Sequence, residues 1–280
     1  VSGVLVRDIP PIIKKHYTHP PIVQSIPDYA ARNYTLMRIA MQHKDVTLWA
    51  TANPSTILEL LRTVNEHHDE IINDIAHGTL SDHFDIPDDI RQQLLPYTST
   101  PYPERANELK QLLREKGKLS PKDYWPYLQY MSTWKCGNTK IYMEKYLDEF
   151  NWDITYYQEL GYIATECRFG FALDDTNESV LFPHFHYYEF VEESELDCPN
   201  KHFLQLDELK VGKRYNAYVT TYSGLYRYNM NDLIEVGGHF RNTPTVHMVR
   251  KVNGIVSMTG EKLDESQSIK AVHEAEEETH

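Results

Sequence analysis

The sequence lacks any hydrophobic run long enough to cross a membrane. A spanning helix needs about 20 consecutive apolar residues, and no apolar stretch approaches that length. The chain begins with Val1 and carries no recognisable signal peptide. Cysteine is also scarce, with only Cys136, Cys167 and Cys198, which is too few for a disulfide framework and is typical of a reducing compartment. We therefore expect a cytoplasmic protein with no membrane partner.

The chain has fewer basic than acidic residues. The chain has 28 lysines and arginines against 41 aspartates and glutamates, which gives a formal net charge of −13. Such a surface repels phosphate backbones, so the composition argues against a nucleic acid polymer as a partner. A single nucleotide held in a local pocket remains compatible with this charge.

Several common catalytic motifs are absent. The sequence contains no G-x-x-x-x-G-K-[ST] loop, no G-x-G-x-x-G turn and no G-x-S-x-G elbow. His184 and His186 are two residues apart in a predicted strand, so both face one side and would suit a metal. No third ligand follows at a recognisable spacing, and the run is rich in aromatic residues. Core packing is therefore the favoured interpretation of this pair.

The first half of the chain alternates predicted helices and strands. The residues 28–43 form an amphipathic helix pattern, and 45–51 read as a short strand. A second helix should begin at Pro54, with Asn53 as its cap, and should end at Gly78.

The same cap-plus-proline pattern recurs further along the chain. Ser120-Pro121 predicts another helix start, followed by a strand over 130–136 and a helix that reaches about Phe150.

From Tyr162 onward the pattern becomes β-rich. Alternating runs predict strands at 179–192, 214–222, 232–238 and 245–252. We expect a layered α/β subdomain over residues 1–160, a β-rich subdomain over 161–258 and a hinge that starts a further segment over 259–280.

One stretch of this β-rich half, "TYSGLYRYNMNDLI" (221–234), gathers aromatic and basic side chains around Gly224. We expect Tyr222, Arg227 and Tyr228 to brace the bend and to fix the acid that follows it, Asp232.

A second stretch, "LGYIATECRFGF" (160–171), places Thr165 and Glu166 after Tyr162, where the chain passes into its β-rich half. A hydroxyl beside a carboxylate is the pair needed to hold a phosphate oxygen and its Mg²⁺. The residues alone also allow a strand-end cap. A later run, "VRKVNGIVSMTGEKLDE" (249–265), brings Arg250 and Lys262 in order.

Together these ordered motifs resemble the adenylate-forming superfamily, and specifically the auxin-responsive promoter family of acyl acid–amido synthetases. Tyr162–Glu166 is similar to its Tyr-x-x-Ser/Thr-Glu motif, and Gly224–Asp232 to its Gly-Leu-Tyr-Arg-Tyr-x-x-Gly-Asp motif. The opening residues and the blocks at 52–81 and 180–191 also look like family sequence, so the resemblance covers essentially the whole chain.

The chain departs from the family pattern in two ways. The family glycine before the motif acid is Asn231, a residue that tolerates positive φ less freely than glycine. The family's phosphate loop and its mobile C-terminal lid have no counterpart in the printed sequence. The chain therefore resembles the middle and end of the large domain, and we expect it to be inactive alone.

The resemblance implies an α/β fold in which a layered subdomain is joined to a β-rich, barrel-like one, as in the large domain of adenylate-forming enzymes. It also implies a ligase that uses ATP and Mg²⁺ to activate a small carboxylic acid as an acyl-adenylate and then joins it to an amino acid. Two alternatives remain open, namely thioester transfer to coenzyme A or a carrier protein, and a non-catalytic relic that binds little.

Transferred position by position, the resemblance gives each motif residue a role. Thr165 would touch the α-phosphate, Glu166 would carry Mg²⁺, the backbone around Tyr162 would border the adenine, and Asp232 would accept the ribose hydroxyls. Near the hinge, two cations would contact the ribose or phosphates: Arg250 and Lys262. The acyl pocket would be lined by Phe169 and Phe171, with Val4 and Leu5 as further candidates, and core packing is an equal alternative for these four.

Overall fold

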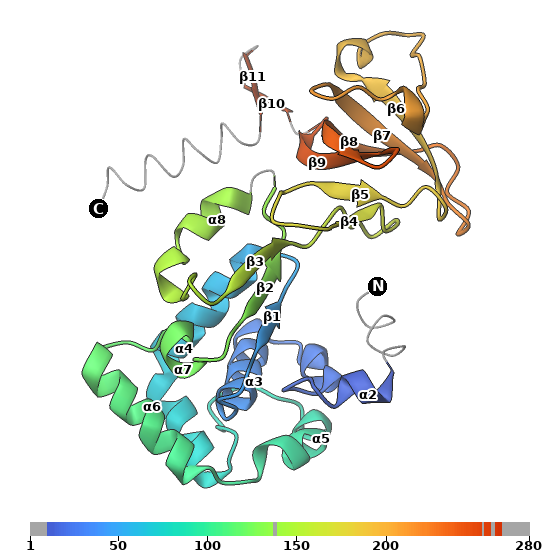
Figure 1. The fold of residues 1–280 in the computed structure, drawn as a ribbon. Coiled ribbons are helices and arrows are strands. Elements are labelled where there is room, and N and C mark those ends of the chain that lie inside the picture. Colours follow the sequence, from blue (N-terminus) through green and yellow to red (C-terminus); the bar gives the residue numbers. More distant parts are fainter. Residues whose placement is uncertain (1–9, 137–138, 254, 259–260, 265–280) are drawn as a thin grey trace. The chain divides into compact units, whose positions relative to one another are not determined.

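The computed structural model describes residues 10–136, 139–253, 255–258 and 261–264 (Figure 1). The chain divides into two compact units, and each is described by itself. Unit 1 comprises residues 1–132 and 142–157, and unit 2 comprises residues 133–141 and 158–280.

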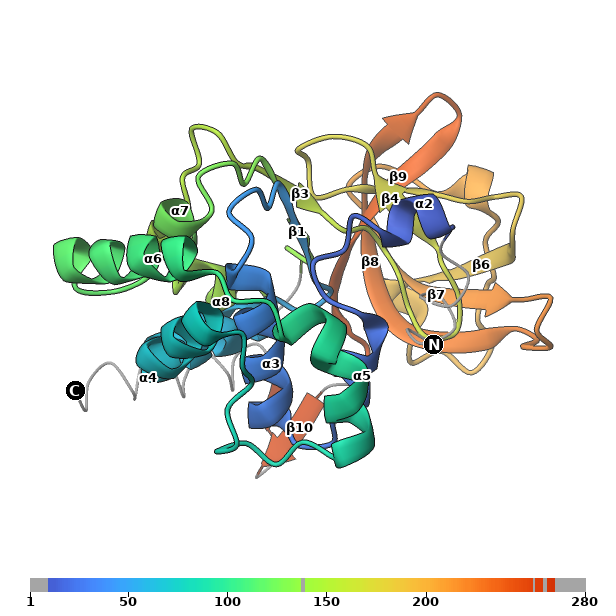
Figure 2. The same ribbon diagram turned by 90° about the horizontal axis from the view of Figure 1, so that it is seen from below.

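Helices dominate the first half of the chain. The α-helices are α2 (Pro11–Lys14), α3 (Tyr29–Met41), α4 (Pro54–His77), α5 (Asp88–Thr98), α6 (Pro103–Lys116), α7 (Pro121–Tyr124) and α8 (Lys140–Glu144), and the 3₁₀ turns are η1 (Pro21–Ser25) and η3 (Leu147–Glu149). A small sheet runs in the order β1 (Leu48–Ala50), β2 (Tyr130–Thr133) and β3 (Tyr156–Glu159), with β1 and β2 parallel. Helices α3 and α4 pack against each other in unit 1 (Figure 2).

The boundaries of α4 follow local sequence rules. The Asn53 side chain accepts a hydrogen bond from the Ser55 backbone N–H at 3.0 Å, and Pro54 occupies the first turn. Gly78 ends the helix in the left-handed conformation, with φ of 69°. The predicted start and end of this helix are confirmed, because both depend on contacts within a few residues.

The second predicted cap is wrong. Ser120 makes no capping hydrogen bond, and the helix that follows has only four residues. Its hydroxyl instead donates a hydrogen bond to Glu149 Oε2 at 2.6 Å. The side chain that would cap the helix therefore binds a residue distant in sequence. The predicted helix reaching Phe150 is likewise shorter, since α8 ends at Glu144 and a 3₁₀ turn follows.

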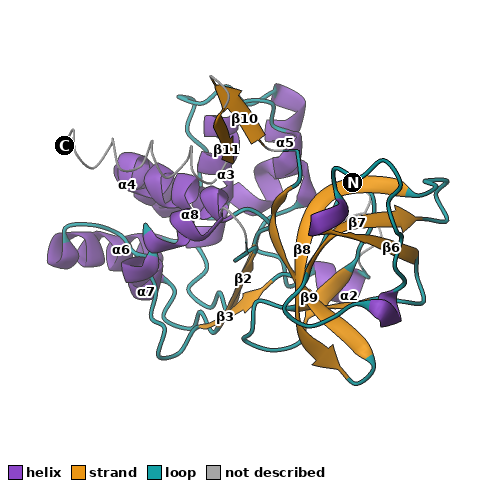
Figure 3. Ribbon diagram, turned by 90° about the horizontal axis from the view of Figure 1, so that it is seen from above, coloured by secondary structure: helices purple, strands orange, loops and turns teal. Residues whose placement is uncertain are grey.

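Unit 2 is built on a six-stranded antiparallel sheet (Figure 3). Its strands are β4 (Gly170–Ala172), β5 (Ser179–Leu181), β6 (Tyr187–Glu192), β7 (Arg214–Thr220), β8 (Tyr228–Phe240) and β9 (Thr243–Lys251), in the order β4-β5-β9-β8-β7-β6. Two short 3₁₀ turns, η4 (Glu193–Glu195) and η5 (Leu206–Glu208), lie in the connection from β6 to β7. A separate hairpin pairs β10 (Ile255–Met258) with β11 (Glu261–Asp264).

Two strand predictions need correction. The run 179–192 is not one strand but two, β5 and β6, and Pro183 lies in the break because it has no N–H for a ladder hydrogen bond. Strand β8 begins at Tyr228, four residues before the predicted start at Asp232. Asp232 is therefore inside a strand rather than at its beginning.

Each unit has its own hydrophobic core. In unit 1 the core is formed mainly by α3, α4 and the segments that pack on them, and in unit 2 by the inner face of the antiparallel sheet. The predicted α/β fold class is confirmed. The predicted boundaries after residues 160 and 258 stay predictions, and the predicted hinge 259–280 lies outside the described residues except for β11. In the described part of the chain, no helix combines the length and apolar character needed to cross a bilayer.

Candidate nucleotide site

Thr165 and Glu166 lie at the tip of a tight loop in unit 2. Ile163 and Arg168 form an isolated antiparallel bridge that closes this loop. The Thr165 side chain is exposed and Glu166 is half-buried. The loop therefore presents a hydroxyl and a carboxylate next to each other where a dissolved ligand can reach them.

The base of this loop is fixed by a buried acid and a glycine. Glu159 accepts hydrogen bonds from the backbone N–H groups of Gly161, at 3.0 Å, and Lys135, at 2.5 Å. Burial raises the pKa of the Glu159 carboxyl. Gly161 has φ of 103°, and a Cβ there would lie only 2.6 Å from the Phe171 Cα. These contacts set the direction in which the chain enters Tyr162.

Tyr162 connects the two sequence motifs. Its ring stacks on Phe169 with 4.1 Å between centroids, and Phe169 in turn stacks on Tyr188 at 5.5 Å. The Tyr162 hydroxyl donates a hydrogen bond to Asp232 Oδ2 at 2.7 Å. Burial, together with the neighbouring Asp232 charge, raises the pKa of Tyr162 well above its usual value, so the phenol stays a proton donor.

Asp232 lies inside β8 and is only 2% exposed. It pairs in register with Lys251 of β9, whose Nζ lies 2.5 Å from Asp232 Oδ1. The residue before it, Asn231, has φ of 58° and accepts a backbone hydrogen bond from Val252 at 2.9 Å. The buried carboxylate thus has a phenol on one oxygen and an ammonium near the other.

The bend before Asp232 is held by some of the predicted residues. Gly224 turns the chain with φ of 101°, and Arg227 follows with φ of 42°. The Arg227 guanidinium binds both carboxylate oxygens of Glu189 on β6, at 2.6 and 2.9 Å, which confirms its bracing role. Tyr222 is 95% exposed, so its predicted bracing role is wrong. Tyr228 is 40% exposed, and its hydroxyl lies 3.5 Å from Glu166.

Arg250 and the next residue, Lys251, bind different carboxylates. Its guanidinium donates to Glu193 Oε1 at 3.0 Å, whereas the next residue, Lys251, reaches Asp232. Adjacent side chains in a strand face opposite sides, so only one of the two cations can lie beside the acid. Sequence reasoning missed Lys251. Its cross-strand register with Asp232 would have revealed it, but a bulge between Leu233 and Ile234 makes that register hard to predict.

The two phenylalanines proposed for the acyl pocket differ in burial. Phe169 is fully buried in the core of unit 2. Phe171 is 43% exposed and contacts Phe182, with 5.3 Å between ring centroids. Of the pair, Phe171 has the surface that a ligand would contact, and Phe169 supports Tyr162 from within.

Three predicted residues fall wholly or partly outside the described structure. Val4 and Leu5 precede residue 10. Lys262 lies in β11, where its backbone pairs with Ser257, and its side chain is not described.

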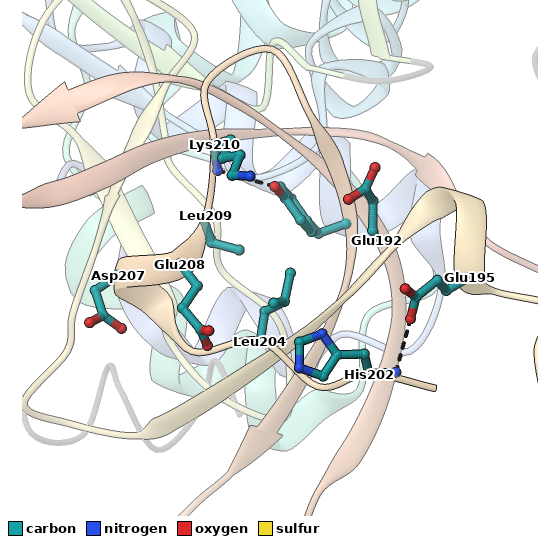
Figure 4. Close-up of a pocket in the computed structure, with 9 residues that line it drawn as sticks. Glu192, Glu195, His202, Leu204, Asp207, Glu208, Leu209 and Lys210 are labelled. Atoms are coloured by element: carbon teal, nitrogen blue, oxygen red, sulfur yellow. Dashed lines mark hydrogen bonds between the residues drawn. The ribbon is translucent and has the colours of Figure 1, made fainter. Parts of the chain in front are cut away.

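A separate hollow in unit 2 contains none of the predicted residues (Figure 4). It has a volume of about 430 Å³, and its lining mixes leucine side chains with carboxylates. Its lining residues are Glu192, Glu195, His202, Leu204, Asp207, Glu208, Leu209, Lys210 and Tyr215.

The described residues contain no group of three or more histidine, cysteine, aspartate or glutamate side chains placed to hold a metal. His184 is exposed and His186 half-buried. Burial raises the pKa of the Cys167 thiol to about 12, so this cysteine, next to Glu166, remains protonated and is a poor nucleophile. Glu166 is thus left as a single carboxylate, which suits Mg²⁺ that takes its other ligands from water and phosphate.

Comparison with known proteins places these motifs in a family. Residues 1–152 match the GH3 family N-terminal domain, and residues 179–251 match the GH3 family central domain. The second match includes Asp232 and Lys251. The loop with Thr165 and Glu166 lies between the two matched ranges.

The chain is similar to curated plant synthetases. Indole-3-acetic acid-amido synthetase GH3.3 of Arabidopsis thaliana is 25% identical over 268 residues, which are 92% of this chain and 44% of that protein. The 4-substituted benzoates-glutamate ligase GH3.12 of the same organism is 25% identical over 273 residues, 92% of this chain and 45% of the relative. The chain thus spans less than half the length of these relatives.

A solved structure shares the fold. GH3.15 acyl acid amido synthetase superposes with a TM-score of 0.78 at 22% identity, over 99% of this chain and 48% of that one. The N-terminal domain match alone accounts for 152 of the 280 residues. The resemblance drawn from the sequence motifs is therefore confirmed, and the chain belongs to the GH3 family.

Proposed function

We propose that this chain is part of an ATP-dependent ligase that converts a small carboxylic acid into an acyl-adenylate and then joins the acyl group to the amine of an amino acid. A carboxylate resists attack by an amine because its oxygen is a poor leaving group, and adenylation replaces that oxygen with AMP. Family membership supports the reaction class. The observation that carries the proposal is the Tyr162–Asp232 hydrogen bond, because it brings together two motifs that are 70 residues apart in sequence.

The nucleotide side of the site is assigned as follows. Asp232 accepts hydrogen bonds from the ribose hydroxyls, since an ionised carboxylate is a pure acceptor with about four lone-pair positions. Thr165 donates its hydroxyl to the α-phosphate, and the backbone around Tyr162 borders the adenine. Two cations complete this side by contacting the ribose or phosphates: Arg250 and Lys262.

Glu166 is proposed as the Mg²⁺ ligand. Its position at an open loop tip fits a cation that keeps several water molecules and binds one or two carboxylates together with substrate phosphates. When bound, Mg²⁺ would neutralise phosphate charge. The protein's own contribution is to hold Glu166 beside Thr165, so that the charge and the hydroxyl face the same phosphate.

The acid substrate is proposed to contact Phe171, with Phe169 behind it and with Val4 and Leu5 as further lining residues. The relatives support the substrate classes, since their names specify indole-3-acetic acid in one case and a 4-substituted benzoate with glutamate in another. An aromatic or otherwise apolar acid and an amino acid are therefore the substrates we propose. A cytoplasmic site of action is also proposed, and three free cysteines support it.

Exchange of labelled pyrophosphate into ATP by the complete gene product tests the first step. Exchange that depends on one acid in a panel supports adenylation, whereas no exchange with any acid contradicts it. Amide formation is then measured with a panel of amino acids. Product formation with coenzyme A in place of an amino acid would show thioester transfer and would overturn the second half of the proposal.

A further inference from the structure

Asp232 has an unusual environment for a residue that must accept a ligand. It is 2% exposed, and a carboxylate removed from water needs donors or an opposite charge nearby to stay ionised. The Tyr162 phenol supplies one donor, at 2.7 Å. A single neutral donor offsets only part of the cost of burying a charge. A second partner is needed.

Lys251 is that partner. It is the register partner of Asp232 across the β8–β9 pair, and its Nζ lies 2.5 Å from Asp232 Oδ1. The neighbouring cation, Arg250, is bound to Glu193 and does not share this task. The Cys167 thiol, which burial keeps protonated, and the Glu166 carboxylate also act on Tyr162.

The two existing contacts leave hydrogen-bond acceptor positions on Asp232 unused. A carboxylate offers about four lone-pair positions. Tyr162 uses one of them by a hydrogen bond to Oδ2, whereas Lys251 forms an ion pair without a hydrogen bond to Oδ1, so enough positions remain for the two hydroxyls of a ribose. Because Asp232 is almost fully buried, a neighbouring side chain must shift before a ribose can reach it. The Lys251 side chain is 47% exposed and is long and flexible, so it has the freedom to do so.

We propose that Lys251 is a positioning residue of the ribose site, a role that rests on the proposed function and deepens it. Its ammonium offsets the cost of burying the Asp232 charge, and its exposed stem moves aside to admit the ribose while the ammonium remains near the carboxylate. Arg250, the cation that the sequence motif favoured, pairs with Glu193 of η4 and does not contact Asp232.

Binding of ATP and of 2′,3′-dideoxy-ATP to the complete gene product tests this role. Lys251→Met should weaken ATP binding by about tenfold to a hundredfold, the range expected when a charge-assisted contact is lost. Binding of the dideoxy analogue should change little, so the preference for ATP over the analogue collapses. Lys251→Arg should keep most of the preference, because the charge is retained.

A matched control is available in the same unit. Lys213 also forms an ion pair with a carboxylate, Glu192 at 2.9 Å, and its side chain is 53% exposed. Lys213→Met should leave both affinities unchanged. Should Lys251→Met fold poorly, Lys251→Gln, which keeps a donor and removes the charge, should show the same loss of preference.

Four results would overturn the proposal. Tighter ATP binding by Lys251→Met would mean that the lysine competes with ribose for Asp232. Equal losses for ATP and the analogue would place Lys251 at the phosphates or in the general stability of the fold. A wild-type protein that binds ATP without any preference over the analogue would refute the ribose assignment of Asp232 itself, and one that does not bind ATP would refute the proposed function; the role of Lys251 falls with either.

Discussion

Asp74 in unit 1 and Asp232 in unit 2 are both buried aspartates, and their surroundings differ in a way that separates structure from binding. Asp74 is 4% exposed and accepts hydrogen bonds from the Tyr34 hydroxyl, the Thr79 hydroxyl and the Ser81 backbone N–H, at 2.7, 2.6 and 2.7 Å. Tyr34 belongs to the core of unit 1, and the other two donors lie in the segment that follows α4. Its hydrogen-bonding capacity is used by the protein itself.

Asp232 is as deeply buried but has only one fixed donor. Its second partner is a half-exposed lysine whose position can change. A carboxylate whose donors are all fixed holds segments of the fold together. A carboxylate paired with a movable lysine can exchange that partner for a ligand. Burial alone therefore does not distinguish the two roles, whereas the mobility and chemistry of the partners do.

The largest effect on stability is expected for Asp74→Ala. The change leaves the fully buried Tyr34 hydroxyl without an acceptor, at about 1–3 kcal/mol for a buried unsatisfied group, whereas Thr79 and Ser81 can bind water. Unfolding free energy, measured by urea denaturation, should fall by about 1–3 kcal/mol. Asp69→Ala is the control, because that side chain is 88% exposed. A loss no larger than the control's would contradict the structural role of Asp74.

Asp232→Ala should act mainly on binding. Each charge-assisted hydrogen bond contributes about 1.5–3 kcal/mol, or about tenfold to a hundredfold in affinity, so the loss of two ribose contacts should weaken ATP binding by about a hundredfold or more. The preference for ATP over its dideoxy analogue should disappear, and the stability loss should be smaller than that of Asp74→Ala. If instead the variant is destabilised while its nucleotide affinity and preference are retained, Asp232 is a structural acid like Asp74.

Glu166→Gln tests the loop tip, where the acid is only half-buried and does not belong to the core. The substitution keeps the shape and removes the charge proposed to hold Mg²⁺. Pyrophosphate exchange should fall by about a hundredfold, in line with the loss of one electrostatic group at a reacting phosphate. Higher Mg²⁺ should restore part of the activity, and Tm should change little. Asp175→Asn, in an exposed loop, serves as the control. A large drop in Tm with normal exchange would mark Glu166 as a structural cap.

The smallest effect is expected from a third buried acid, Glu159, whose donors are two backbone N–H groups. Its pKa is raised on folding, mainly by burial, so the folded state holds the proton more tightly than the unfolded chain. Its contribution to stability should therefore be greatest at low pH and decline as pH rises above the ordinary value of 4.5 through the folded-state value.

The contribution of Glu159 is measured as the difference in unfolding free energy between wild type and Glu159→Gln. The other carboxylates contribute equally to both proteins, so their effects cancel in this difference. Wild type should lose stability relative to the variant as pH rises through this window. If the difference in unfolding free energy stays constant with pH, burial does not raise the pKa of Glu159.

Short-range features were predictable from sequence because their causes are local. The cap at Asn53, the proline that follows and the left-handed Gly78 act within one helical turn, and the structure has all three. The turn at Gly224 is of the same kind. Ser120 has the same local pattern as Asn53, yet its hydroxyl went to Glu149, a residue 29 positions away. Local rules fail where a distant partner competes for the same side chain.

The sequence by itself determined the family motifs, the α/β class and the choice of Thr165, Glu166 and Asp232 as chemical groups, because these depend on residue type and order. Only the tertiary structure decided which groups meet. Strand register placed Lys251 rather than Arg250 beside Asp232, and packing put Phe169 inside the core while Phe171 stayed half-exposed. Register and packing are set by the sum of many contacts between distant segments, so no pattern within a single stretch of sequence contains them.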